Sequence, residues 1–449
     1  MKKEKSKTIF VCSECGAIFH KWVGKCTECG AWNTVNEEVG PSKSTIRTSF
    51  KSTPQYYKIS ELTSDKQSHI PTGINELDRV IGGGFMKGSV TLLSGNPGIG
   101  KSTLALQIAD SLKSYKILYI SSEESPEQLK IRAERLNVIN ENLYLSGENL
   151  LDNILYIIDL TEPEMVIIDS IQTIYSEEFE SSPGGVLQTR ECTTRLLKVT
   201  KEKGLLTILI GHITKEGIIA GPKVLEHLVD TVILMEGDQN NFFRIIRCLK
   251  NRFGPTREIG IFEMKEGGLI PVQDPSLLFI SERRKNASGS TIAVSIEGMR
   301  PLLIEIQALI AKSIYPTPQR NSNGVDYRRL TMLLAVIEKR ANIPITALDI
   351  FINIVGGLRI DDPACDLAIV TSILSSYFDK PVDPEAVFIG EVGLVGEVRS
   401  VKNMETRINE AARLGFKRIY IPKKLKLPDK NITLIKIESI NELIQNIFS

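Results

Sequence analysis

The sequence predicts an α/β protein of three parts, in which a small cysteine-rich segment precedes two larger domains. From about residue 59 onward, short apolar runs alternate with amphipathic stretches, which is typical of a mainly parallel sheet covered by helices on both faces. Four of the seven cysteines lie within residues 12–29. A length of 449 residues predicts two or three domains.

The composition restricts the classes of function. A hydrophobic fraction of 42%, a charged fraction of 24% and a net charge of +1 are ordinary for globular proteins, so a nucleic-acid surface would have to be a local patch. No stretch approaches the roughly 20 apolar residues of a membrane span, and no signal peptide follows the basic start, so we expect no membrane partner. The scattered Cys192, Cys248 and Cys365 favour a reducing, cytoplasmic setting.

The first 36 residues carry two C-x-x-C pairs separated by ten residues, and these predict a zinc ribbon. The expected ligands of Zn²⁺ are Cys12, Cys15, Cys26 and Cys29. Gly16 and Gly30 follow the pairs, where tight turns need backbone freedom. So short a segment has no core, and metal binding, worth about 10–16 kcal/mol in comparable peptides, would drive its folding. A redox role for one pair is the alternative, although four thiolates leave no vacancy for chemistry.

The remaining chain is predicted as a linker and two domains. Residues 37–58 are rich in Ser, Thr, Lys and Pro and predict a flexible linker. In the domain spanning 59–275, strands are expected at 89–94, 116–121, 164–169, 205–211 and 230–235, and helices at 102–112 and 126–136. In the domain spanning 276–449, helices are expected at 326–340, 363–378 and 404–416, and strands at 349–355 and 417–423.

The sequence GNPGIGKST fits G-x-x-x-x-G-K-[ST] and connects an expected strand to an expected helix, which predicts an ATP site. Backbone N–H groups of such a loop and of the helix N-terminus bind phosphates. Lys101 would reach the β- and γ-phosphates, and Ser102 would bind Mg²⁺. The residues expected to bind the nucleotide are Gly95, Asn96, Pro97, Gly98, Ile99, Gly100, Lys101, Ser102 and Thr103.

Polar residues at the ends of other expected strands complete a hydrolysis site. Asp169 ends one apolar run, where a carboxylate suits the Mg²⁺ shell. Glu123 and Glu124 follow another run, and one of them would polarise the attacking water. For Glu124, an acidic helix start is the alternative. His212 follows a third run and would sense the γ-phosphate, with a structural histidine as the alternative.

The stretch PTGINELDRVIGGGFMKGSVTLLSGNPGIGKST resembles the start of a RecA-superfamily ATPase core. Together with the four-cysteine segment and the sequence KNRFG at 250–254, the chain resembles the bacterial RadA (Sms) family over essentially its whole length. That resemblance implies a DNA-dependent ATPase of recombinational repair, associated with the nucleoid. It further implies a hexameric ring that drives branch migration of intermediates made by the RecA recombinase. By the same resemblance, Glu123 rather than Glu124 is the catalytic glutamate.

The resemblance also implies a role for the KNRFG sequence. In ring ATPases of this superfamily the site lies between subunits, and Lys250 and Arg252 would reach the γ-phosphate bound by a neighbouring copy. In the better-studied GTPase case such a finger contributes about 10³–10⁵ in rate. Phe253 and Gly254 would shape the turn that aims the two cations. A solvated basic turn is the alternative.

Two polar, glycine-containing segments, 175–192 and 214–227, correspond to the loops that hold single-stranded DNA in RecA-like rings. The expected phosphate contacts are Arg190, Arg195, Lys215 and Lys223. Aromatic residues are scarce in both segments, so binding of single-stranded and branched DNA would depend mainly on phosphates and weaken with salt.

From about residue 285 the chain resembles the proteolytic domain of the Lon family, whose catalytic dyad is a serine and a lysine. The serine position falls on Ala364, and the lysine position falls on or near Glu405, with Lys402 out of register. Covalent catalysis needs both a nucleophile and a base, so we expect an inactive protease that serves as an assembly platform. Basic residues that would add a duplex-DNA surface are Arg328, Arg329 and Arg407, with solvated helix faces as the alternative.

Three hypotheses from different classes therefore follow. The leading one is a hexameric ATP-driven DNA motor that acts on recombination intermediates. The second is an ATP-fuelled peptidase that captures substrates with its zinc ribbon, against which Ala364 counts. The third is a RecA-like timing or signalling ATPase that does not move along DNA.

Overall fold

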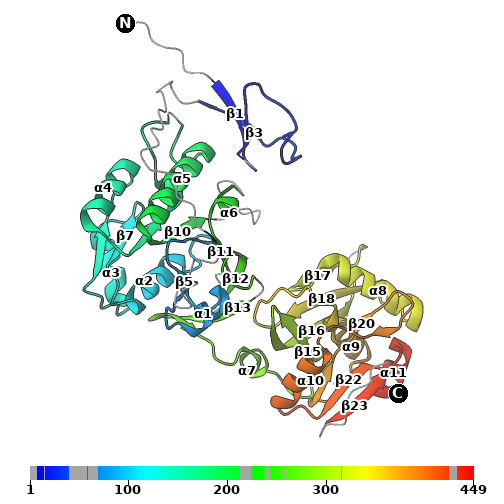
Figure 1. The fold of residues 1–449 in the computed structure, drawn as a ribbon. Coiled ribbons are helices and arrows are strands. Elements are labelled where there is room, and N and C mark those ends of the chain that lie inside the picture. The colour runs from blue at the N-terminus through cyan, green and yellow to red at the C-terminus, as the bar shows by residue number, and fades with distance from the viewer. Residues whose placement is uncertain are drawn as a thin grey trace. The chain divides into compact units, whose positions relative to one another are not determined.

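The computed structural model describes residues 8–14, 16–39, 58, 69–179, 181–212, 224–237, 243–256, 258–314, 316–423 and 432–448 (Figure 1). The chain divides into two compact units, Met1–Pro271 and Val272–Ser449. Within the described residues, no helix has both the length and the apolar character needed to cross a membrane.

The N-terminal residues form a three-stranded antiparallel sheet in the order β2-β1-β3. Its strands are β1 (Thr8–Cys12), β2 (Ile18–Phe19) and β3 (Val35–Val39). Cys12, Cys26 and Val35 are buried together in its small core. So few buried apolar side chains agree with the expectation that metal binding folds this segment.

The core of the first unit is a nine-stranded sheet. In spatial order its strands are β14 (Gly268–Pro271), β13 (Ile259–Lys265), β12 (Phe243–Asn251), β11 (Thr231–Glu236), β6 (Val90–Gly95), β10 (Leu206–His212), β9 (Met165–Asp169), β7 (Ile117–Ser121) and β8 (Leu143–Ser146). The six strands from β11 to β8 are parallel, and β12, β13 and β14 extend the sheet in antiparallel fashion. A separate two-stranded antiparallel sheet pairs β4 (His69–Ile70) with β5 (Phe85–Met86). The five strands expected from the apolar runs are confirmed.

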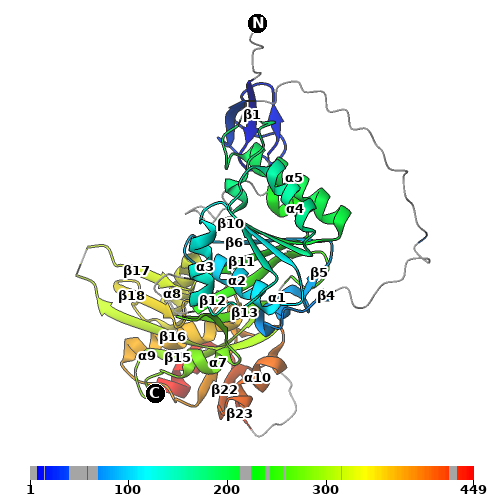
Figure 2. The same cartoon turned by 90° about the vertical axis from the view of Figure 1, so that its left-hand side faces the viewer.

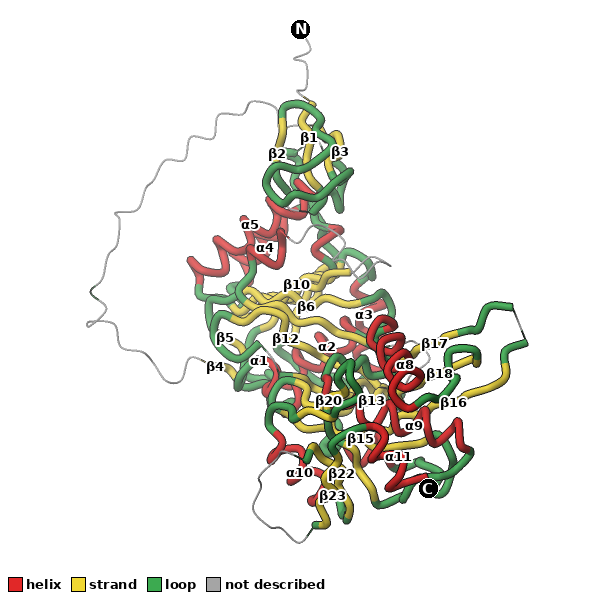
Figure 3. Tube along the Cα trace, turned by 90° about the vertical axis from the view of Figure 1, so that its right-hand side faces the viewer, coloured by secondary structure: helices red, strands yellow, loops and turns green. Residues whose placement is uncertain are grey.

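Helices cover both faces of this sheet, as the uninterrupted apolar character of its central strands predicts. The helices are α1 (Asn75–Ile81), α2 (Lys101–Ser111), α3 (Pro126–Arg135), α4 (Leu151–Thr161), α5 (Val186–Lys203) and α6 (Val224–Leu228). Adjacent residues of β6 enter opposite cores: Leu93 packs with α1, α2 and α3, and Leu92 packs with α4, α5 and α6. Figure 3 shows the strands lying between α4–α5 and α1–α2.

The second unit is built on a seven-stranded mixed sheet. In spatial order its strands are β17 (Arg320–Asn323), β18 (Leu348–Ile354), β16 (Arg300–Lys312), β15 (Ser290–Glu297), β19 (Ala386–Phe388), β22 (Arg418–Pro422) and β23 (Thr433–Ile437). Its helices are α7 (Pro275–Ile280), α8 (Tyr327–Ala341), α9 (Asp366–Phe378), α10 (Met404–Arg413) and α11 (Ile440–Phe448). A separate hairpin pairs β20 (Glu391–Val392) with β21 (Val398–Arg399). The helices and strands expected in this part of the chain are confirmed.

Candidate ATPase site and associated sites

The phosphate loop connects β6 to α2, as its sequence predicts. A Cβ atom at Gly95 would lie 2.6 Å from the carbonyl oxygen of Met235, so only glycine fits there without moving the backbone. Gly100 caps α2 with a φ of +114°, which other residues rarely adopt. The first N–H groups of α2 have no partner within the helix, so the loop and helix together form a cradle suited to phosphate.

Lys101 lies in this cradle and is 4% exposed. Its Nζ donates hydrogen bonds to the carbonyl oxygens of Gly95 at 2.8 Å and Asn96 at 2.9 Å. Burial lowers the pKa of Lys101 to about 8, although the negative charges of Asp169 and Glu123 oppose the change. The ammonium therefore lies beside the loop backbone, where phosphate oxygens would meet it.

The register of the parallel strands brings the other predicted residues to the same edge of the sheet. His212 pairs with Gly95 across β10 and β6, and Ser121 pairs with Asp169 across β7 and β9. Glu123 follows β7 by two residues and therefore enters the same edge. In α/β sheets, ligands bind at the carboxyl ends of the strands, and this edge is the corresponding position here.

Hydrogen bonds hold Glu123 in this cluster. Its Oε1 accepts from Ser170 Oγ at 2.6 Å, and His212 Nε2 lies 3.1 Å from the same oxygen. The hydrogen bond from His212 is the main reason that the pKa of Glu123 is lowered to about 2. Glu124 instead pairs with Arg132 of α3. The structure thus places Glu123, and not Glu124, beside Lys101 and Asp169.

Asp169 is buried and accepts a hydrogen bond at Oδ2 from Tyr119 Oη at 2.8 Å. Burial and the Asp169 charge raise the pKa of Tyr119 well above its usual range. Oxygen ligands are what Mg²⁺ prefers, so the Asp169 carboxylate and the Ser102 hydroxyl fit this ion. The sequence interpretation missed Tyr119 and Ser170, although a tyrosine in an aliphatic strand and a serine directly after Asp169 were available as signals.

The cysteine cluster has the geometry of a zinc site. The Sγ atoms of Cys12, Cys26 and Cys29 all lie within 4.8 Å of one another, and those of Cys12 and Cys29 are 3.8 Å apart. Tetrahedral zinc with Zn–S bonds of about 2.3 Å requires sulfur atoms about 3.8 Å apart. Cys15, the fourth predicted ligand, lies outside the described residues.

The backbone around the cysteines shows two matching turns. Gly16 N donates to Cys12 O at 2.8 Å, and Gly30 N donates to Cys26 O at 2.9 Å. Both glycines adopt a positive φ, 68° at Gly16 and 75° at Gly30. The two C-x-x-C-G segments therefore form equivalent turns, and the donors present fit Zn²⁺.

Lys250 and Arg252 lie away from Lys101 within the same chain. Because β12 runs antiparallel to β11, Lys250 pairs with Val232, near the beginning of β11, while the phosphate loop lies at the opposite strand ends. Lys250 Nζ donates to the carbonyl oxygens of Glu226, His227 and Val229, at and just beyond the C-terminal end of α6. Arg252 Nη1 donates to Asp230 Oδ1 at 3.0 Å. Neither cation reaches the nucleotide site of its own subunit.

The prediction that 175–192 is a loop is wrong for its last seven residues, because α5 begins at Val186. Leu187 and Cys192 are buried on this helix. Arg190 Nη1 donates to Gly16 O at 3.2 Å, and Arg195 pairs with Asp152 and Glu178, so protein groups already bind both predicted DNA contacts. The helix was missed because glycines and acidic residues precede its apolar positions. Lys215 and Lys223 lie outside the described residues.

The position that resembles a protease nucleophile is buried. Ala364 is fully buried, and burial raises the pKa of the neighbouring Cys365 thiol well above its usual range. Arg407, expected on the surface, is 4% exposed and donates to Asp362 Oδ2 and Val294 O, both at 2.6 Å. Arg329 pairs with the buried Asp366. Both arginines therefore pair with carboxylates of their own unit, and the buried Arg407 is not part of a surface.

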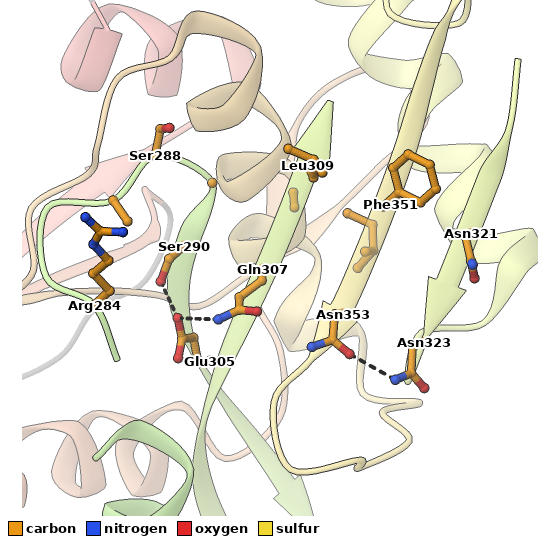
Figure 4. Close-up of a pocket in the computed structure, with 14 residues that line it drawn as sticks. Arg284, Ser288, Ser290, Glu305, Gln307, Leu309, Asn321, Asn323, Phe351 and Asn353 are labelled. Atoms are coloured by element: carbon orange, nitrogen blue, oxygen red, sulfur yellow. Dashed lines mark hydrogen bonds between the residues drawn. The ribbon is translucent and has the colours of Figure 1, made fainter. Parts of the chain in front are cut away.

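A separate cavity of about 510 Å³ lies in the second unit against β15, β16, β17 and β18 (Figure 4). Its polar groups largely bond to one another. Glu305 Oε1 accepts from Ser290 Oγ and Gln307 Nε2, and Asn323 Nδ2 donates to Asn353 Oδ1. None of the predicted site residues lines it.

The fold and the site define a P-loop ATPase of the RecA type that carries a zinc ribbon before its core. The KaiC ATPase family matches residues 70–147 and 139–276, the rubredoxin metal binding domain matches 10–37, and subunit ChlI of Mg-chelatase matches 328–425. The DNA repair protein RadA of Listeria monocytogenes is 45% identical over 454 residues, which cover 99% of each chain. The chain belongs to the RadA family of DNA repair proteins.

A second relative and a solved structure were also found. The DNA repair protein RadA of Bacillus subtilis is 47% identical over 429 residues, covering 94% of this chain and 93% of its own. The crystal structure of the RadB recombinase aligns with 45% of this chain and 99% of its own at 24% identity, with a TM-score of 0.37.

Proposed function

We propose that the protein is a DNA-dependent ATPase that works as a motor on branched recombination intermediates, as a hexameric ring and together with the RecA recombinase. The observation that carries this proposal is the cluster of Lys101, Glu123, Asp169 and His212 at one sheet edge. Further support comes from the relatives, which are DNA repair proteins, and from the resemblance to ring ATPases at KNRFG.

In this proposal, different residues of the chain have different roles in hydrolysis. The loop amides and Lys101 hold the phosphates, and Glu123 accepts a proton from the attacking water. Ser102 and Asp169 would hold Mg²⁺, and that ion would supply neutralisation of the charge on the phosphates. Ser170 and His212 orient the Glu123 carboxylate, because both bond to its Oε1.

The proposal assigns Lys250 and Arg252 to the site of a neighbouring subunit. Their place at the opposite strand ends, away from the phosphate loop of their own chain, supports this assignment. To reach a neighbour's γ-phosphate, Lys250 would exchange the carbonyl oxygens near α6 for phosphate oxygens. Lys215 and Lys223, in the segment that follows His212, remain the predicted phosphate contacts of single-stranded DNA.

The second unit is proposed to hold the ring together and to perform no proteolysis. Ala364 has no nucleophilic oxygen, and burial keeps the Cys365 thiol protonated. A peptidase would need both a nucleophile and a base to activate it.

The decisive experiment measures ATP turnover with and without single-stranded DNA over a salt series, on native protein and on Lys101→Ala. We expect DNA to raise turnover, salt to weaken the effect, and Lys101→Ala to lower turnover roughly 10²-fold or more. Branch migration on a synthetic three-strand junction then tests the motor. If DNA leaves the turnover of the native protein unchanged, the signalling ATPase replaces the motor.

A further inference from the structure

The two tryptophans of the sequence, Trp22 and Trp32, both lie in the zinc ribbon and are both exposed, to 61% and 68%. Neither belongs to the ribbon core, which is formed around Cys12, Cys26 and Val35. Exposing two of the largest apolar side chains costs solvation free energy without stabilising the fold. Such residues at a surface indicate a site of contact.

Local contacts hold both rings in defined positions. Trp22 Nε1 donates to Val35 O at 3.1 Å, and its ring lies over Gly24, where an added Cβ would come within 3.5 Å of Cη2. Lys25 pairs with Trp32 across an isolated bridge, and its Nζ lies 5.4 Å from the ring centroid. The Trp22 N–H is therefore satisfied, and the exposed ring surfaces remain available for stacking.

The ribbon packs against the beginning of α5 (Figure 2). Ile9 and Val11 of β1 share a core cluster with Leu187 of α5, and Arg190 Nη1 donates to Gly16 O. The segment that precedes α5, of which residues 175–179 and 181–185 are described, belongs to a predicted DNA loop. The ribbon therefore lies beside this predicted DNA loop.

We propose that Trp22 and Trp32 form a nucleobase-stacking site for single-stranded DNA, with Lys21 and Lys25 beside its phosphates. The inference rests on the proposed DNA-dependent function and names a second contact for the same DNA. Every base has a flat π-surface, so the site would tolerate any sequence. Glu14, Glu28, Glu37 and Glu38 also belong to the ribbon, so stacking rather than charge supplies most of the binding free energy.

The size of the surface favours a nucleic acid over a protein partner. Among the described ribbon residues, Ile18 is the other large apolar side chain that is exposed. Protein interfaces of standard size bury about 800 Å² on each side around an apolar centre, and two rings with one isoleucine fall short of that. Two aromatic rings flanked by lysines are sufficient to stack successive bases.

The two tryptophans also provide the test, because intrinsic tryptophan emission reports on the ribbon alone. Zinc-loaded full-length protein is titrated with oligothymidylate, and tryptophan emission is compared with the anisotropy of a labelled oligonucleotide. We expect emission to be quenched in parallel with binding. Trp22→Ala and Trp32→Ala should each weaken binding at least roughly fivefold. Trp22→Phe should retain most of the affinity, and zinc content verifies that each ribbon is folded.

Tyr156→Ala is the matched control, because Tyr156 of α4 is also an exposed aromatic side chain, and its affinity for DNA should equal that of native protein. Unchanged emission and unchanged affinity of the tryptophan variants, in a protein whose ATPase still responds to DNA, would overturn this inference and leave the motor intact. Quenching by DNA without any effect on turnover would support the stacking site and contradict the motor. Emission that responds to added RecA recombinase but not to DNA would make the ribbon a protein-docking surface and overturn the inference.

Discussion

At the scale of single residues, the site depends on what surrounds Glu123. A general base must be deprotonated to accept a proton, and the hydrogen bond from His212 keeps Glu123 ionised by lowering its pKa to about 2. Ser170 bonds to the same oxygen and limits its orientation. Tyr119 likewise limits the orientation of the Asp169 carboxylate, to which its hydroxyl donates a hydrogen bond. Glu123 is thus held by Ser170 and His212, and Asp169 by Tyr119, so the two acids have separate partners.

His212→Ala should therefore shift the acid limb of the pH–rate profile. Without the imidazole, the pKa of Glu123 rises from about 2 towards its ordinary value of 4.5, so the base becomes protonated, and activity is lost, at a higher pH than in native protein. Turnover at neutral pH should also fall, because the carboxylate loses one of its two orienting partners. The pH dependence of ATP turnover measures both effects. His227→Ala is the control, and an unchanged acid limb in His212→Ala would show that the pair does not tune the base.

At the scale of secondary-structure elements, the direction of β12 decides the role of KNRFG. An antiparallel strand beside β11 carries Lys250 away from the phosphate loop and towards the C-terminal end of α6. Carbonyl groups at a helix C-terminus attract cations, so α6 and Lys250 stabilise each other. Burial lowers the pKa of Lys250, while the nearby acids Asp230 and Glu226 oppose the change. The end of β12 is thereby linked to α6 through Lys250.

Mixing two defective variants tests whether Lys250 acts on a neighbour's nucleotide. Lys250→Ala and Lys101→Ala should each have low DNA-stimulated turnover as pure proteins. A mixed ring contains interfaces with an intact phosphate loop on one side and an intact Lys250 on the other, so the mixture should recover part of the native turnover. Steady-state ATP hydrolysis over a series of mixing ratios measures the recovery. A mixture as inactive as its two components, or Lys250→Ala with native DNA translocation, would contradict action between subunits.

At the scale of the whole molecule, two folded units share one chain, and the residues of the proposed ATPase site lie in the first. Parallel strands align Gly95, His212, Asp169 and Ser121 at one edge of the first unit. In the second unit, two charged side chains instead form ion pairs that stabilise the fold. Arg407 neutralises Asp362, and Arg329 neutralises Asp366. This use of charge is consistent with a domain whose task is assembly.

Arg407→Met should destabilise the second unit, since it leaves the Asp362 carboxylate without its charged partner. Breaking a buried ion pair from one side costs about 3–5 kcal/mol in unfolding free energy. Arg359→Met removes the exposed pair with Asp361 and should cost about 0–1 kcal/mol. Hydrogen exchange in α10 and β15 measures local stability, and light scattering reports whether the ring dissociates. Equal protection in the two variants would show that the Arg407 pair is not what stabilises this unit.

Local patterns in the sequence alone predicted the ribbon, the phosphate loop, most of the strands and helices, and Lys101, Asp169 and His212 as site residues, because each depends on residues close together in the chain. The choice of Glu123 over Glu124 came from the family resemblance. Only the tertiary structure decided which groups meet across long separations. Sheet register brought Ser170 and His212 to Glu123, and packing placed Arg190 against Gly16 and buried Arg407 beside Asp362. The sequence shows that a side chain is polar, but strand order, strand direction and burial decide which group it bonds to.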